Sequence, residues 1–78
     1  MQYNSFLDWL INTKNISRRA AKDVVSRCRR ICNILNVDAI DADTLQSLNN
    51  NAEFIEKSMF IKSQLRRAIA LWLEFGGE

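Results

Sequence analysis

The sequence contains no histidine and no proline, and its only glycines are Gly76 and Gly77. Without histidine, the chain cannot form a Ser-His-Asp or Cys-His catalytic arrangement or a zinc finger of the Cys/His type. A phosphate-binding loop needs closely spaced glycines, and none precedes Gly76. Strand-rich folds need turn residues at short intervals, which are also missing. We therefore expect an all-α protein without a cofactor or catalytic activity of its own.

Long apolar runs are missing as well. No segment approaches the roughly 20 apolar residues that a membrane span needs, and the N-terminus lacks the pattern of a signal peptide. These absences predict a cytoplasmic protein without membrane contact. Cys28 and Cys32 are four residues apart and share one helix face. Since no histidine or third cysteine can complete a metal site, we expect two buried free thiols and no bound metal.

Two regular helices are predicted in the first half of the chain. The first covers Asn4–Asn12, with Asn4 or Ser5 as its N-cap. The second begins after Ser17 as N-cap and ends before Asn36 as C-cap. Steps of three and four residues between apolar positions support the second helix. Its predicted buried positions are Ala21, Val24, Val25, Cys28, Ile31, Cys32 and Leu35.

The second half predicts shorter helices followed by one long helix. Asp43 is a candidate cap for a short helix, and a further turn follows from 52 to 57. The last helix runs from Ser58 to Phe75 and stops at Gly76. The residues expected to be buried in this half are Leu45, Leu48, Phe54, Ile55, Ile61, Leu65, Ala68, Ile69, Trp72 and Phe75. No linker or repeat divides the chain, so residues 1–78 form a single predicted domain.

Charge is distributed unevenly along the chain, although the formal net charge is only +2. The segment Lys14–Arg30 contains seven basic residues and one acidic residue, Asp23. The segment Asp38–Glu56 contains five acidic residues and no basic one, and Lys57–Arg67 contains four basic residues and no acidic one. Two basic helices separated by an acidic segment predict a molecule with one positive side.

The basic residues of the second helix lie mainly opposite its apolar stripe. Arginine also outnumbers lysine seven to four in the whole chain. Arginine is the preferred partner of phosphate because its guanidinium group can donate two parallel hydrogen bonds. The pattern is typical of a nucleic-acid-binding face, and a solvated surface helix is the alternative interpretation. The candidate DNA-binding residues are Arg18, Arg19, Lys22, Ser26, Arg29, Arg30, Lys62 and Arg66.

Three segments resemble the N-terminal core-binding domain of tyrosine recombinases, the phage-integrase-type site-specific recombinases. FLDWL (Phe6–Leu10) is similar to the first helix of that domain, NISRRAAKDVVSRCRRICNIL (Asn15–Leu35) resembles the second, and SQLRRAIALWLEF (Ser63–Phe75) resembles the last. Leu45 and Leu48 fall where the family has a short helix. The resemblance covers nearly the whole chain and implies a compact, SAM-like bundle of four to five helices.

The resemblance also implies a function. In this family the domain forms half of a clamp around duplex DNA, while the catalytic residues lie in a second, downstream domain. We therefore expect a non-catalytic DNA-binding module of a recombinase or integrase. Its partners would be double-stranded DNA in the nucleoid and a downstream catalytic domain, with oligomers forming only on DNA if at all. The alternative is a small helical protein-interaction module or adaptor whose basic face meets an acidic partner.

Overall fold

This computed structural model describes residues 3–76 of the chain. The regular elements of these residues are all α-helices, joined by short loops. The helices are α1 (Asn4–Asn12), α2 (Arg18–Leu35), α3 (Thr44–Asn49), α4 (Ala52–Ile55) and α5 (Met59–Phe75). Strands are absent from these residues, and the elements agree with the expected small bundle. The predicted all-α class is therefore confirmed.

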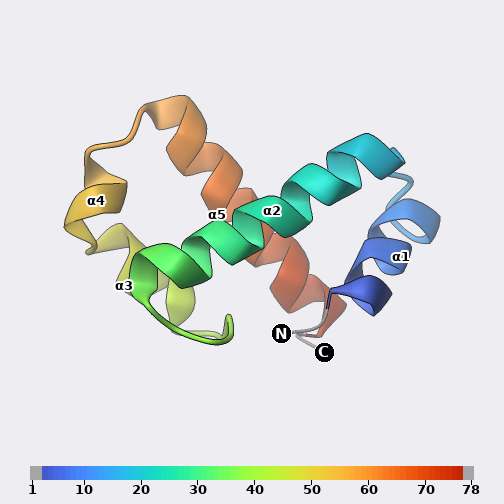
Figure 1. Ribbon diagram of the computed structural model, residues 1–78, viewed down its shortest axis with the longest axis horizontal. Coiled ribbons are helices and arrows are strands. Elements are labelled where there is room, and N and C mark those ends of the chain that lie inside the picture. Colours follow the sequence, from blue (N-terminus) through green and yellow to red (C-terminus); the bar gives the residue numbers. More distant parts are fainter. Residues whose placement is uncertain (1–2, 77–78) are drawn as a thin grey trace.

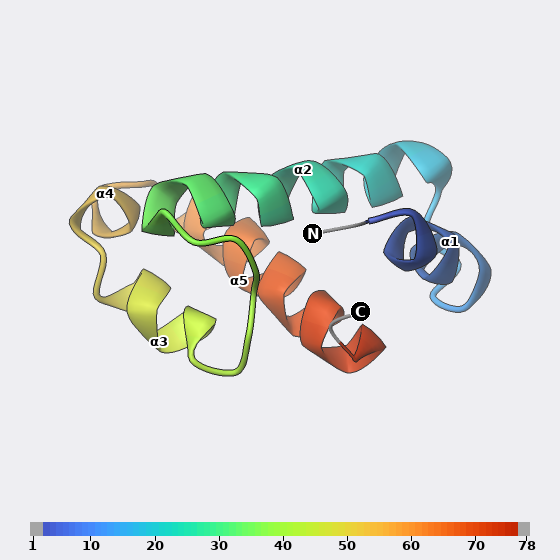
Figure 2. The same ribbon diagram turned by 60° about the horizontal axis from the view of Figure 1, so that its bottom comes forward.

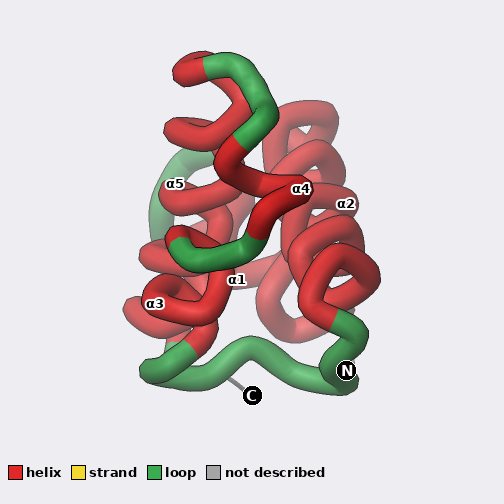
Figure 3. The backbone as a smooth tube through the Cα atoms, turned by 90° about the vertical axis from the view of Figure 1, so that its left-hand side faces the viewer, coloured by secondary structure: helices red, strands yellow, loops and turns green. Residues whose placement is uncertain are grey.

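Helices α2 and α5 cross at the centre of the molecule and make its most extensive helix–helix contact (Figure 1). Helix α1 lies at one end of the crossing, and α3 and α4 lie at the other. Figure 3 views the molecule from the α3–α4 end. In Figure 2, α2 runs along one side of the molecule, with α1, α3 and α5 below it. One face of α2 is therefore left uncovered by the other helices.

The ends of the two long helices lie where they were predicted, with Ser17 and Asn36 capping α2 and Gly76 ending α5, and Ser58 is an additional N-cap. The Ser17 hydroxyl accepts a hydrogen bond from the Ala20 N–H at 3.2 Å, and the Ser58 hydroxyl accepts one from the Ile61 N–H at the same distance. Each bond satisfies an N–H group that has no partner within the helix. Asn36 ends α2 in the left-handed conformation at φ 56°. Gly76 ends α5 at φ 105°, where a side chain would be strained.

Two predicted caps are wrong in detail. Helix α1 already includes Asn4, and Tyr3 holds the N-cap position without a side-chain cap. Asp43 precedes α3, but its side chain makes no capping hydrogen bond. Instead the Asp41 carboxylate accepts a hydrogen bond from the Asp43 N–H at 2.8 Å, and the Thr44 hydroxyl accepts one from the Asp41 N–H at 2.8 Å. This local turn replaces the expected cap.

The core lies between the two crossing helices and the shorter helices beside them. Aromatic side chains gather where α1 meets the end of α5. The ring centroid of Phe6 lies 4.9 Å from that of Trp72 and 5.4 Å from that of Phe75. The Trp72 indole N–H also donates a hydrogen bond to the Ile40 carbonyl at 3.2 Å, which ties the segment before α3 to α5. Trp72 and Phe75 therefore pack as predicted, and Trp9 is partly buried against the same cluster.

Several apolar side chains of the shorter helices are more exposed than predicted. Leu45 is 38% exposed and Ile55 is 54% exposed, whereas their expected partners Leu48 and Phe54 are buried. Helix α3 has six residues and α4 has four, so neither completes two turns. Apolar spacing cannot define a buried face over so short a length.

Candidate nucleic-acid interface

Helix α2 separates apolar and basic residues onto opposite faces. Its fully buried residues are Ala21, Val24, Val25, Cys28 and Ile31. Cys32 and Leu35 are partly buried against the same core, so the predicted apolar stripe is correct. The predicted site residues of this helix are all exposed, namely Arg18, Arg19, Lys22, Ser26, Arg29 and Arg30. The structure therefore brings six of the eight predicted site residues together on the uncovered face of one helix.

The basic side chains of α2 form no ion pair with any carboxylate of residues 3–76. The ion pairs found in residues 3–76 are Lys14 with Glu74, at 2.8 Å, and Lys57 with Glu53, at 3.8 Å. Neither pair includes a residue of α2. Asp23 is the helix's one acidic residue, and it is exposed. The outer face of α2 thus presents cations whose charge is available to an external anion.

The two predicted site residues of α5 have a different environment. The Arg66 Nε–H donates a hydrogen bond to the Asn49 side-chain oxygen at 3.1 Å. The same guanidinium group lies 5.2 Å from the centre of the Phe54 ring, which is a cation–π distance. Arg66 therefore links α5 to α3 by a hydrogen bond and to α4 by a cation–π contact. Lys62 is partly buried rather than fully outward-facing.

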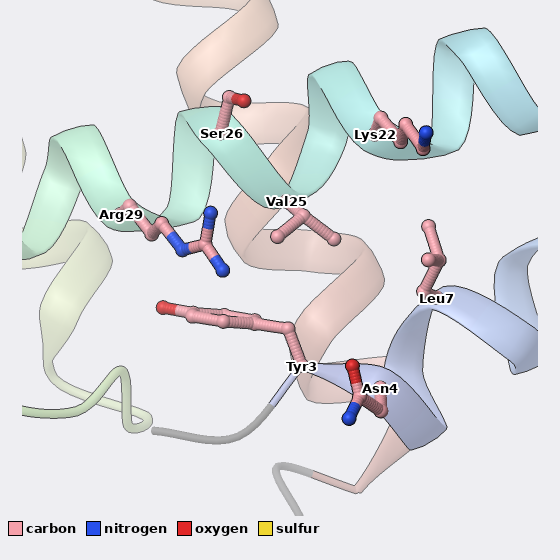
Figure 4. A pocket seen from close by; sticks show the side chains of 7 residues that line it. All are labelled: Tyr3, Asn4, Leu7, Lys22, Val25, Ser26 and Arg29. Carbon is pink, nitrogen blue, oxygen red and sulfur yellow. The ribbon is translucent and has the colours of Figure 1, made fainter.

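A pocket of about 310 Å³ lies between the start of α1 and the middle of α2 (Figure 4). Arg29 borders it, with its guanidinium group 5.1 Å from the centre of the Tyr3 ring. The sequence pattern did not predict that the N-terminal segment contributes to this site. An aromatic residue directly before a helix was the available signal, but only the packing of α1 on α2 shows which face it meets. The lining residues are Tyr3, Asn4, Leu7, Lys22, Val25, Ser26 and Arg29.

The two cysteines lie on the buried side of α2, away from its basic face. Cys28 is fully buried, and its thiol contacts the Ala68 carbonyl at 3.8 Å. Burial, together with the neighbouring Cys32, raises the pKa of the Cys28 thiol to about 12. Within residues 3–76, no group of acidic and cysteine side chains has an arrangement that could hold a metal ion. The prediction of a buried thiol outside any disulfide is confirmed for Cys28, while Cys32 is only half-buried and is not in a disulfide bond.

The raised pKa of Cys28 gives a testable pH dependence. The folded-state pKa of about 12 exceeds the ordinary value of 9.0, so the thiol's contribution to stability is complete below pH 9 and is lost as the pH rises toward 12. We expect the free energy of unfolding to fall across this window by up to about 1.4 kcal/mol per pH unit from this group. Urea unfolding at a series of pH values checks this, and the Cys28→Ala variant should show a shallower decline. An identical decline in the variant would contradict the assignment.

Comparison with protein-family models, curated proteins and solved structures found no match to this chain. Among the described helices, none combines the length and the apolar character that crossing a membrane requires.

Proposed function

We propose that this chain binds duplex DNA through the outer face of α2 and acts by positioning DNA rather than by chemistry. One observation supports this proposal above the others. Five exposed cations lie on the uncovered face of a single helix, without a carboxylate partner in the part of the chain that the structure describes. They are Arg18, Arg19, Lys22, Arg29 and Arg30.

The dimensions and chemistry of α2 suit a phosphate backbone. A helix of 18 residues is about 27 Å long, so its basic face can follow several phosphates of one duplex. Arginine side chains can donate two parallel hydrogen bonds to one phosphate. Such backbone contacts fix the orientation of a protein on the duplex but carry little sequence information. The proposed binding is therefore weak and largely independent of sequence.

Lys62 and Arg66 of α5 are proposed to make additional DNA contacts. Arg66 uses its Nε–H to contact Asn49, and its two terminal nitrogens carry four further N–H donors. In the proposal, Arg66 and Lys62 contact DNA that extends beyond α2. The resemblance to tyrosine recombinases supports a finer proposal, in which the domain holds DNA in the nucleoid for a catalytic domain of the same protein. The chain itself then takes no part in strand cleavage.

Salt dependence of the affinity tests the proposal. Binding to phosphates releases condensed counterions, and log K falls by about 0.9 for each contacted phosphate per unit of log salt concentration. Five cations therefore predict a slope between about −3 and −5 in a fluorescence-anisotropy titration with labelled duplex DNA. A measurable affinity with a slope near zero, or no affinity at low salt, would contradict DNA binding.

An acidic protein partner is the competing occupant of the same face. Polyglutamate of matched charge serves as the control ligand, because it carries negative charge without phosphate geometry. Duplex DNA carries one negative charge per about 1.7 Å of its axis and a condensed counterion atmosphere, so counterion release predicts that it binds more tightly than polyglutamate at equal charge and salt. Tighter binding of polyglutamate would favour the protein-interaction module instead.

A further inference from the structure

The pocket between α1 and α2 has walls of three chemical kinds. Lys22 and Arg29 supply positive charge, Ser26 and Asn4 supply a hydroxyl and an amide, and Leu7 and Val25 supply apolar surface. Its volume of about 310 Å³ is at the lower end of the range for small-ligand sites, about 300–1,000 Å³.

The two cations border opposite ends of the same opening. They are seven residues apart on α2, which places their backbones about 10.5 Å apart along the helix, with Ser26 between them. In Figure 4, Lys22 lies on the side of Leu7, and the guanidinium group of Arg29 points toward the ring of Tyr3. Both side chains are long enough to approach one anion placed between them.

Tyr3 holds Arg29 in position without adding negative charge. The Arg29 guanidinium lies 5.1 Å from the centre of the tyrosine ring, and such a contact restricts an otherwise flexible side chain. Burial raises the pKa of Tyr3 to about 12, so its hydroxyl group is uncharged at neutral pH. Because Arg29 is exposed, its N–H donors stay accessible at the pocket edge, and holding them in place lowers the entropy cost of binding an anion.

We propose that this pocket is the subsite for one sugar-phosphate unit of a nucleic-acid backbone. The phosphate lies between Lys22 and Arg29 and accepts a hydrogen bond from the Ser26 hydroxyl, and the sugar packs against Leu7 and Val25. The inference rests on the proposed function, because it assigns a DNA contact to a particular place on the molecule. It adds that α1 contributes to binding and that the α2 contacts are unequal in strength.

A substitution that fills the pocket without changing any charge provides the first test. Ser26 is exposed in the middle of α2, and leucine is a good helix former, so Ser26→Leu should preserve the fold. The matched control is Ala20→Leu, which adds the same side chain at an exposed position of α2 outside the pocket. We expect Ser26→Leu to weaken duplex binding about tenfold, the loss typical of one hydrogen bond to a charged group. Ala20→Leu should bind as the unsubstituted protein does.

Two neighbouring arginines provide the second test. Arg29 borders the pocket, whereas Arg30 is exposed on α2 outside it, so Arg29→Gln and Arg30→Gln remove equal charge. We expect Arg29→Gln to weaken duplex binding several-fold more than Arg30→Gln, with unchanged helical circular dichroism in both. If the protein binds duplex DNA but each pocket variant matches its control, the subsite is wrong while the proposed function stands. If the unsubstituted protein does not bind duplex DNA at low salt, both are wrong.

Discussion

Replacing Trp72 with alanine should remove a large fraction of the protein's free energy of unfolding. The side chain is 2% exposed and packs against Phe6, Tyr3 and Phe75. Truncating a buried tryptophan typically costs about 3–5 kcal/mol. A domain of 78 residues has a total stability of roughly 4–12 kcal/mol, so this loss is a large fraction of the whole. Urea unfolding followed by circular dichroism measures the change.

Two further variants make the Trp72 prediction specific. Trp72→Phe keeps an aromatic ring but removes the N–H that donates to the Ile40 carbonyl, so we expect a smaller loss of about 1–3 kcal/mol. Phe60→Ala is the matched control, since it truncates an aromatic side chain of the same helix that is 69% exposed. Its effect should stay within about 0.5 kcal/mol. Equal losses in the free energy of unfolding for Trp72→Ala and Phe60→Ala would contradict the burial of Trp72 described above.

Reversing two charges on α2 should have the largest effect on DNA binding. Arg19 and Arg30 are both exposed, and neither makes an ion pair in the described part of the chain, so Arg19→Glu with Arg30→Glu should preserve the fold. Each substitution removes one phosphate contact and adds one repulsion. We expect the affinity to fall about a hundredfold or more and the salt slope to decrease in magnitude by about two. Fluorescence anisotropy with duplex DNA measures both quantities.

A second double reversal controls for net charge. Lys57→Glu with Arg67→Glu changes the formal charge equally but affects residues outside α2 and outside the proposed site, and circular dichroism checks that losing the Lys57–Glu53 ion pair leaves the helices intact. Long-range electrostatics alone predicts equal losses for the two double variants, because both change the total charge by the same amount. If the contact face lies on α2, the control double variant should lose much less affinity for duplex DNA. Equal losses would therefore contradict the assignment of the interface to α2.

The sequence predicted the long helices well because each has several turns of regular apolar spacing. The bounds of α1 were predicted correctly, and Ser17, Asn36, Ser58 and Gly76 mark helix ends as expected. Side-chain caps and left-handed C-caps are local features, so they can be recognised without knowing the tertiary structure. The same regularity placed the basic residues of α2 on its exposed face.

The incorrect and missed features depend on tertiary contacts. Leu45 and Ile55 were expected in the core, but the short helices that carry them turn these side chains toward solvent. Arg66 is exposed, as expected, but its hydrogen bond to Asn49, which spans 17 residues of sequence, was not predicted. The pocket joins Tyr3 to Arg29 across two helices. Periodicity within a segment contains no information about such pairings.

A residue-resolved titration with duplex DNA tests the central claim most directly. Amide chemical shifts of the isotopically labelled protein are followed by NMR at low ionic strength as DNA is added. We predict that the largest changes occur on α2 between Arg18 and Arg30 and at Tyr3 and Leu7, with little change in the acidic segment Asp38–Glu56. Changes centred on that acidic segment, or no changes at low salt, would contradict DNA binding by the basic face of α2.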